Sequence, residues 1–166
     1  MTERFFIQVQ PVIDVKMRQL CLKPYPGHTK GCPNWSKRDI CPPRVPLLSD
    51  SIDLNFPVYA IYNVFDFAGH VSKMRAKHPK WSDRQVGCCL YWQSAARKQL
   101  RKKIKDFLYE NPGLTIIQNP EAQGVNITTT MAMVGLKLEW PPENVTYQIV
   151  LAGTKYSKNR CDIKVM

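Results

Sequence analysis

Three cysteines in the first quarter of this 166-residue chain have the type and spacing of ligands to an inorganic centre. Cys21, Cys32 and Cys41 are separated by ten and then eight residues. Thiolates are soft ligands that suit zinc or the irons of an iron–sulfur cluster. A structural zinc site usually includes two cysteines about two to four residues apart, and this segment contains no such pair. The spacing therefore favours a [4Fe–4S] cluster and leaves zinc as the alternative.

Proline follows two of these cysteines, in Cys32-Pro33 and Cys41-Pro42. A proline confines the preceding residue to extended backbone, and a Cys-Pro step also closes the ferredoxin-type cysteine run. Six of the 13 prolines lie in residues 24–46, which excludes a regular helix or a central strand there. Because the loop of residues 21–46 also has few large aliphatic side chains, we expect a metal or a cluster to order it.

Several residues are candidates for the fourth ligand. His28 would complete a Cys3His zinc site, and Cys161 would have to fold back from the C-terminal part of the chain. Cys88 and Cys89 are adjacent on an expected helix and point about 100° apart, so at most one faces the site. We interpret this pair as small core residues. A vacant fourth iron would instead leave a position for a substrate.

The segment Gly31-Cys-Pro-Asn-Trp-Ser-Lys-Arg-Asp-Ile-Cys-Pro-Pro43 resembles the cysteine signature of a bacterial and archaeal family known only as predicted metal-binding proteins. Cys21 matches a further upstream cysteine of that signature. Pro120-Glu-Ala-Gln-Gly-Val-Asn126 is similar to the family's second signature, Glu-Ala-x-Gly followed by an aliphatic residue and Asp or Asn. The resemblance implies a cytoplasmic cluster-binding protein and no particular reaction.

This chain departs from the family pattern in two ways. The residues Tyr25-Pro-Gly-His28 lengthen the upstream spacing. Where family members have a second cysteine-rich stretch, the chain offers only Cys88-Cys89. The resemblance therefore implies one cluster rather than two.

Positive charge is the other chemical feature of the sequence. The chain has 24 Lys and Arg against 13 Asp and Glu, a net charge of +11. Such an excess fits an anionic partner, either nucleic acid or an acidic protein, or an anionic cofactor. Much of this positive charge lies on one face of an expected helix, in Arg97, Lys98, Arg101, Lys102, Lys103 and Lys105. The alternative function is thus a zinc-stapled module that binds nucleic acid with this face, although a solvated helix face explains the same pattern.

The elements that position these residues alternate between strand and helix patterns. We expect strands at residues 5–9, 58–65, 114–118 and 147–151. We expect helices at residues 66–77, 82–109 and 126–134, the second beginning with a capping box of Ser82 and Gln85. The predicted fold is α+β, a single domain over residues 1–166. It has a mixed sheet of about four strands with helices packed on it and one long Pro/Cys-rich loop.

The sequence excludes several classes of protein. Its apolar runs are too short to span a membrane, and its first residues lack an apolar export segment, so we expect a cytoplasmic protein with reduced thiols. It has no G-x-S-x-G, H-E-x-x-H or P-loop motif, which leaves hydrolase, zinc-protease and NTPase activities without support. We expect a small metal-binding protein for electron transfer or cluster-dependent chemistry, and the sequence defines no reaction.

Overall fold

A four-stranded sheet organises the computed structural model, which describes residues 4–25 and 28–157. The strand order is β1-β2-β4-β3, with β1 at Phe6–Val9, β2 at Val58–Asp66, β3 at Leu114–Ile117 and β4 at Val145–Thr154. The predicted α+β class and the four strands are confirmed. All three strand pairings are antiparallel, so the expectation of a mixed sheet was wrong. The order of elements along a chain does not by itself fix the direction in which long connections re-enter a sheet.

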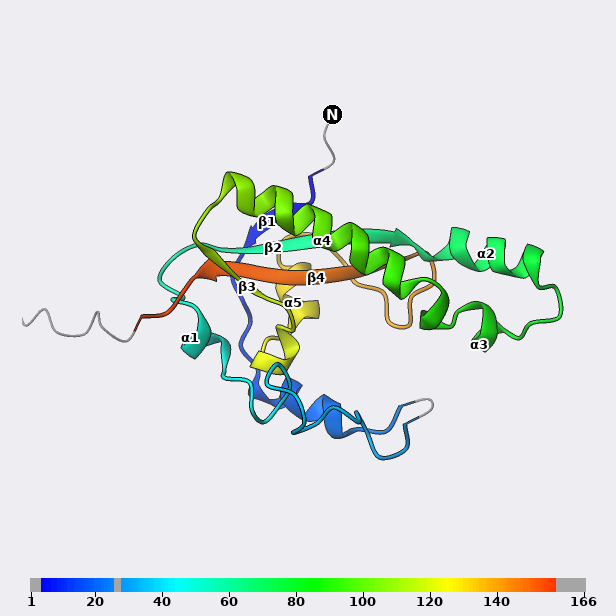
Figure 1. Ribbon diagram of the computed structural model, residues 1–166, viewed down its shortest axis with the longest axis horizontal. Helices are drawn as coiled ribbons and strands as arrows, with labels where there is room; N and C mark the ends of the chain where they lie inside the picture. The colour runs from blue at the N-terminus through cyan, green and yellow to red at the C-terminus, as the bar shows by residue number, and fades with distance from the viewer. Residues whose placement is uncertain (1–3, 26–27, 158–166) are drawn as a thin grey trace, which may run out of the picture.

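Helix α4 (Gln93–Glu110) covers one face of the sheet (Figure 1). The apolar positions of α4 recur at helical spacing and pack on alternate residues of β2 and β4. Phe107 is fully buried there, and the centre of its ring lies 4.9 Å from that of Phe6 and 5.6 Å from that of Tyr59. The helix–sheet layer is thus held by a contiguous apolar core.

The opposite face of the sheet packs on two short helices, α1 (Leu48–Ser51) and α5 (Ile127–Ala132). Leu48, Ile52 and Met131 are fully buried against it. Asn126 caps α5 by accepting a hydrogen bond from the Thr129 amide at 3.0 Å. The segments that carry the first three cysteines lie on this side, away from α4 (Figure 1).

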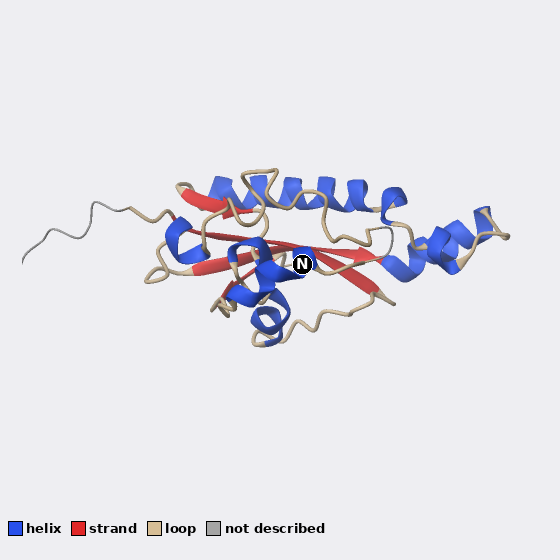
Figure 2. Ribbon diagram, turned by 90° about the horizontal axis from the view of Figure 1, so that it is seen from below, coloured by secondary structure: helices blue, strands red, loops and turns tan. Residues whose placement is uncertain are grey.

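A basic arm extends from the end of β2 and consists of α2 (Phe67–Lys77), α3 (Asp83–Val86) and the 3-10 helix η2 (Cys89–Tyr91) (Figure 2). The capping box of Ser82 and Gln85 is present, but the helix that it begins ends at Gly87. The predicted continuous helix over residues 82–109 is therefore wrong. The chain breaks because Trp92 packs against Phe65 and Phe67 and donates its indole N–H to the Gly87 carbonyl at 3.3 Å.

The break also changes the environment of the cysteine pair. Cys88 lies before η2 in extended backbone and is half-buried, whereas Cys89 is exposed. The interpretation of both residues as core side chains on a helix is wrong for Cys89. Within the described part of the chain, no helix is long and apolar enough to cross a membrane.

Candidate metal centre

Cys21 lies near the end of a 3-10 helix, η1 (Val15–Leu22), which is fixed at its start. Asp14 caps η1 by accepting a hydrogen bond from the Lys16 amide at 3.1 Å. The Asp14 amide itself donates to the Gly124 carbonyl at 2.7 Å, and Ile13 forms a β-bridge with Val125. The backbone that leads to the first cysteine is therefore held by the segment around residue 124.

The Glu-Ala-Gln-Gly signature provides this support. Its first three residues form the 3-10 helix η3 (Glu121–Gln123), which packs against η1. Gly124 ends η3 with φ of 84°, a conformation that favours glycine. The Asn126 amide then donates to the Val12 carbonyl at 2.8 Å, while the Thr130 hydroxyl accepts from the Val12 amide at 2.9 Å. The second signature thus positions the segment that carries the first cysteine.

Cys32 is tied directly to Cys21 through the backbone. Its amide donates to the Cys21 carbonyl at 2.7 Å. Gly31 precedes it with φ of 81°, and a Cβ atom built on Gly31 would lie 2.6 Å from the same carbonyl oxygen. Only glycine fits at position 31, where the segment of Cys32 meets the segment of Cys21, because both the backbone conformation and the available space exclude a side chain.

Cys41 lies in a turn that Arg18, a residue of η1, stabilises through hydrogen bonds. The Cys41 amide donates to the Arg38 carbonyl, and the Val45 amide donates to the Cys41 carbonyl, each at 3.0 Å. The Arg18 guanidinium donates to the carbonyls of Pro43 and Val45, at 3.1 and 2.7 Å. Cys21 and Cys41 are therefore positioned by the same short helix.

The three thiols are close enough for their charges to interact. All three cysteines are half-buried. Burial raises the pKa of the Cys21 thiol, and the negative charges of Cys32, Cys41 and Glu121 raise it further. The side chains of Cys32, Cys41 and Glu121 are thus all within electrostatic range of the Cys21 thiol.

Glu121 forms no ion pair among the described residues. Burial raises the pKa of its carboxyl group, an effect that a hydrogen bond from its own backbone N–H partly offsets. Across residues 4–25 and 28–157 the ion pairs join Arg44 to Asp39 and Arg75 to Asp83, and neither includes Glu121. A positive centre near Cys21 would stabilise the ionised forms of this carboxyl group and of the thiols.

The described donors form no site for a single metal ion. In the described part of the chain, no three His, Cys, Asp or Glu side chains are close enough to hold one metal ion. Zinc–sulfur bonds of about 2.3 Å in a tetrahedral site require sulfurs about 3.8 Å apart. A cluster binds each thiolate through a different iron, so its ligands form a wider triangle. A cluster therefore tolerates a wider spacing of its thiols than a single zinc ion does.

The other candidate ligands have different surroundings. His28 is exposed and its ring packs on Tyr25, with ring centres 4.7 Å apart, so no contact places it among the thiols. Cys161 lies outside the described residues. Desolvation, followed by the charges of Cys32, Cys21 and Cys89, raises the pKa of the Tyr25 hydroxyl.

The basic residues predicted to bind nucleic acid lie on α4, on the other side of the sheet from the segments that carry Cys21, Cys32 and Cys41 (Figure 1). All five are exposed: Arg97, Lys98, Arg101, Lys102 and Lys105. Lys103, which the sequence analysis grouped with them, is half-buried. The structure thus separates the two sets of candidate residues.

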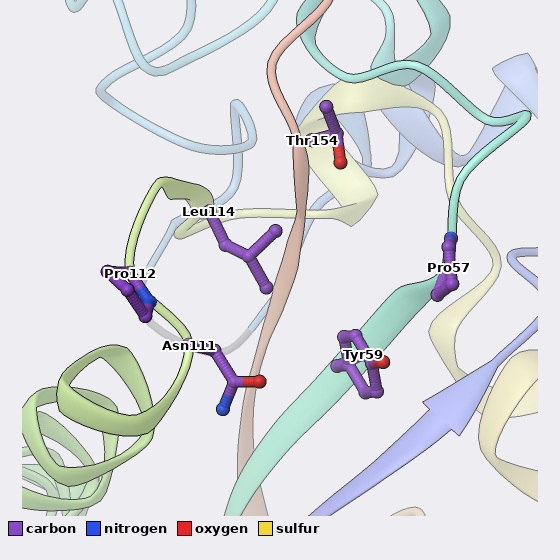
Figure 3. Close-up of a pocket in the computed structure, with 6 residues that line it drawn as sticks. All are labelled: Pro57, Tyr59, Asn111, Pro112, Leu114 and Thr154. Atoms are coloured by element: carbon purple, nitrogen blue, oxygen red, sulfur yellow. The ribbon is translucent and has the colours of Figure 1, made fainter.

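Two cavities open elsewhere on the surface. One, of about 220 Å³, is lined by six residues: Pro57, Tyr59, Asn111, Pro112, Leu114 and Thr154 (Figure 3). The other, of about 600 Å³, lies between residues 8–11 and 54–58. Neither of these cavities is lined by a cysteine.

The chain was compared with known proteins at three levels. No family model, no curated protein and no solved structure matches it.

Proposed function

We propose that this protein holds one [4Fe–4S] cluster through Cys21, Cys32 and Cys41, for electron transfer or for chemistry at the cluster. One observation carries the proposal: Cys32 and Cys41 lie within electrostatic range of Cys21, in a loop of residues 21–46 with little apolar packing. Among the described residues between positions 21 and 46, the buried apolar side chains are those of Pro42 and Val45. Backbone hydrogen bonds hold the loop, including the one from the Cys32 amide to the Cys21 carbonyl.

The charges around the loop support a cluster. A [4Fe–4S] core with three thiolates carries a net charge of about −1, which nearby cations would stabilise. Lys30, Lys37 and Arg38 are exposed on the same loop, and none of them forms an ion pair with a described carboxylate. When bound, the cluster would supply one-electron transfer or a Lewis-acidic iron. The protein's own residues would fix the three thiolates and balance their charge.

Anaerobic purification followed by iron and sulfide analysis tests this proposal. We expect a brown protein with about four irons and four sulfides per chain. Cys32→Ser and Cys41→Ser should each lose most of the bound iron. Cys88→Ser is the matched control, because it removes a half-buried thiol outside the loop and should keep its iron.

Two outcomes would overturn the proposal. A colourless protein with one zinc ion would favour the zinc-stapled alternative over an iron–sulfur cluster. Equal loss of iron in Cys32→Ser, Cys41→Ser and Cys88→Ser would show that the ligands are misplaced. Circular dichroism of each variant separates the loss of a ligand from the loss of the fold.

A further inference from the structure

The positive charge of this protein is concentrated in one region. Residues 70–110 contain eleven Lys and Arg and three Asp and Glu, so they carry +8 of the net charge of +11. This region comprises the basic arm and α4, which follow one another along the chain (Figure 1). The remaining 125 residues are thus close to neutral.

On α4, the cations form one continuous exposed surface. Arg97, Arg101 and Lys105 follow one another at four-residue intervals, with Lys98 and Lys102 beside them, so they span about 140° of the helix circumference and about 12 Å of its length. Like charges four residues apart destabilise a helix. In the part of the chain that the structure describes, no residue of α4 forms an ion pair. No ion pair with a described carboxylate therefore relieves the repulsion on this surface.

Aromatic rings lie at the N-terminal end of this surface. The rings of His78 and Trp81 are stacked, with centres 3.9 Å apart and planes at 7°. The ring of Tyr91, in η2 immediately before α4, lies 5.2 Å from Trp81 and is 53% exposed. Exposed cations flank this stack, namely Lys77, Lys80 and Arg84.

We propose that α4 and the basic arm bind single-stranded nucleic acid. Phosphates would contact the cations of α4, and an unpaired base would stack on the exposed ring of Tyr91. An acidic protein would match the charge but has no reason to require an aromatic platform. A duplex keeps its base faces stacked inside the helix. Single strands alone present both a regular anionic backbone and free base faces.

Fluorescence anisotropy of the full-length protein with labelled single-stranded oligonucleotides tests this proposal. One set of measurements uses oligo(dT) and another uses oligo(U), to distinguish DNA binding from RNA binding. Heparin, a polyanion without bases, is the competitor. The triple variant Arg101→Ala/Lys102→Ala/Lys105→Ala should weaken binding at least tenfold. It should also lower the slope of log affinity against log salt by about 2, because each lost phosphate contact contributes about 0.7. Alanine favours helix, so α4 should remain folded.

Substitutions of Tyr91 separate stacking from simple charge attraction. Tyr91→Ala should weaken oligonucleotide binding about tenfold and leave heparin binding unchanged, whereas Tyr91→Phe, which keeps the ring, should bind as the wild type does. Lys16→Ala, which removes an exposed cation from η1, is the control for net charge. Binding that does not weaken with salt, or an equal effect of Tyr91→Ala on heparin, would overturn the proposal. Because the test uses no iron measurement, it is independent of the cluster.

Discussion

The two faces of the sheet carry regions that are ordered in different ways. Where α4 meets the sheet, side chains such as Phe107 and Leu100 are buried in a continuous apolar core. In the loop of residues 21–46, most side chains are exposed and the order comes from the hydrogen bonds of the backbone and of Arg18. Apolar burial supplies most of the free energy of folding, whereas a hydrogen bond contributes little net stability.

This difference separates stability from chemistry. The layer of α4 and the sheet can lose stability without any change in the thiols, because none of the five described cysteines belongs to its core. The loop can lose its thiol geometry without a large change in global stability, because it buries few apolar groups. Substitutions in the two regions should therefore have opposite patterns of effect on unfolding and on iron content.

The largest effect on stability should come from Phe107→Ala. The side chain is fully buried between Phe6 and Tyr59, so its loss should lower the free energy of unfolding by about 3–5 kcal/mol. Urea unfolding of the apoprotein measures this. Tyr109→Ala on the same helix is the control, because Tyr109 is 89% exposed and its loss should change stability by less than about 0.5 kcal/mol. Iron bound per folded Phe107→Ala molecule should stay unchanged, and a parallel loss of iron would contradict the separation of the two regions.

Gly31→Ala should show the opposite pattern. Its Cβ would lie 2.6 Å from the Cys21 carbonyl oxygen, so the backbone that joins Cys21 to Cys32 must move. We expect most of the iron to be lost although every thiol is present. Gly113→Ala is the matched control, because Gly113 has φ of 89° with no atom within 4 Å of the added Cβ. It should cost about 1–2 kcal/mol of backbone strain and no iron. Equal iron binding by the two variants would show that the contact between Gly31 and Cys21 does not set the geometry.

Sequence patterns predicted the strands and the caps well, because these depend on local chemistry. The Val58 strand, the capping box of Ser82 and the Asn126 cap are present, with boundaries within a few residues of those expected. The break in the long helix was not predicted, because it depends on Trp92 packing against Phe65 and Phe67. Contacts between residues so far apart in sequence have no local signature.

The candidate site was only partly visible in the sequence for the same reason. The spacing of the cysteines and their prolines indicated a metal-binding loop, but not how the thiols approach one another. The hydrogen bond from Asp14 to Gly124 joins segments 110 residues apart, and no pattern near either residue indicates it. Glu121 belongs to the second signature, and its charge acts on the thiol of Cys21 in the folded protein although the two residues are 100 positions apart.

Glu121→Gln should have the smallest effect and would sharpen the comparison between apoprotein and loaded protein. Burial raises the pKa of Glu121 in the folded state above its unfolded value, so the folded state binds the proton more tightly. The resulting contribution to stability is complete below the unfolded pKa, at about pH 4, and is lost as the pH rises through the folded pKa. The apoprotein should therefore lose stability over this range of pH, and Glu121→Gln should not.

Urea unfolding of the apoprotein at a series of pH values measures this difference. Glutamine can still accept the hydrogen bond from the backbone N–H, so the variant removes the charge and keeps the contact. Glu143→Gln, at an exposed position, should leave the pH dependence of the wild type intact. Parallel pH profiles for Glu121→Gln and the wild type would show that the Glu121 carboxylate is not desolvated beside the thiols. If the free energy of unfolding becomes independent of pH only in Glu121→Gln, the ionised Glu121 carboxylate destabilises the apoprotein. A positive centre at the thiols would stabilise that charge.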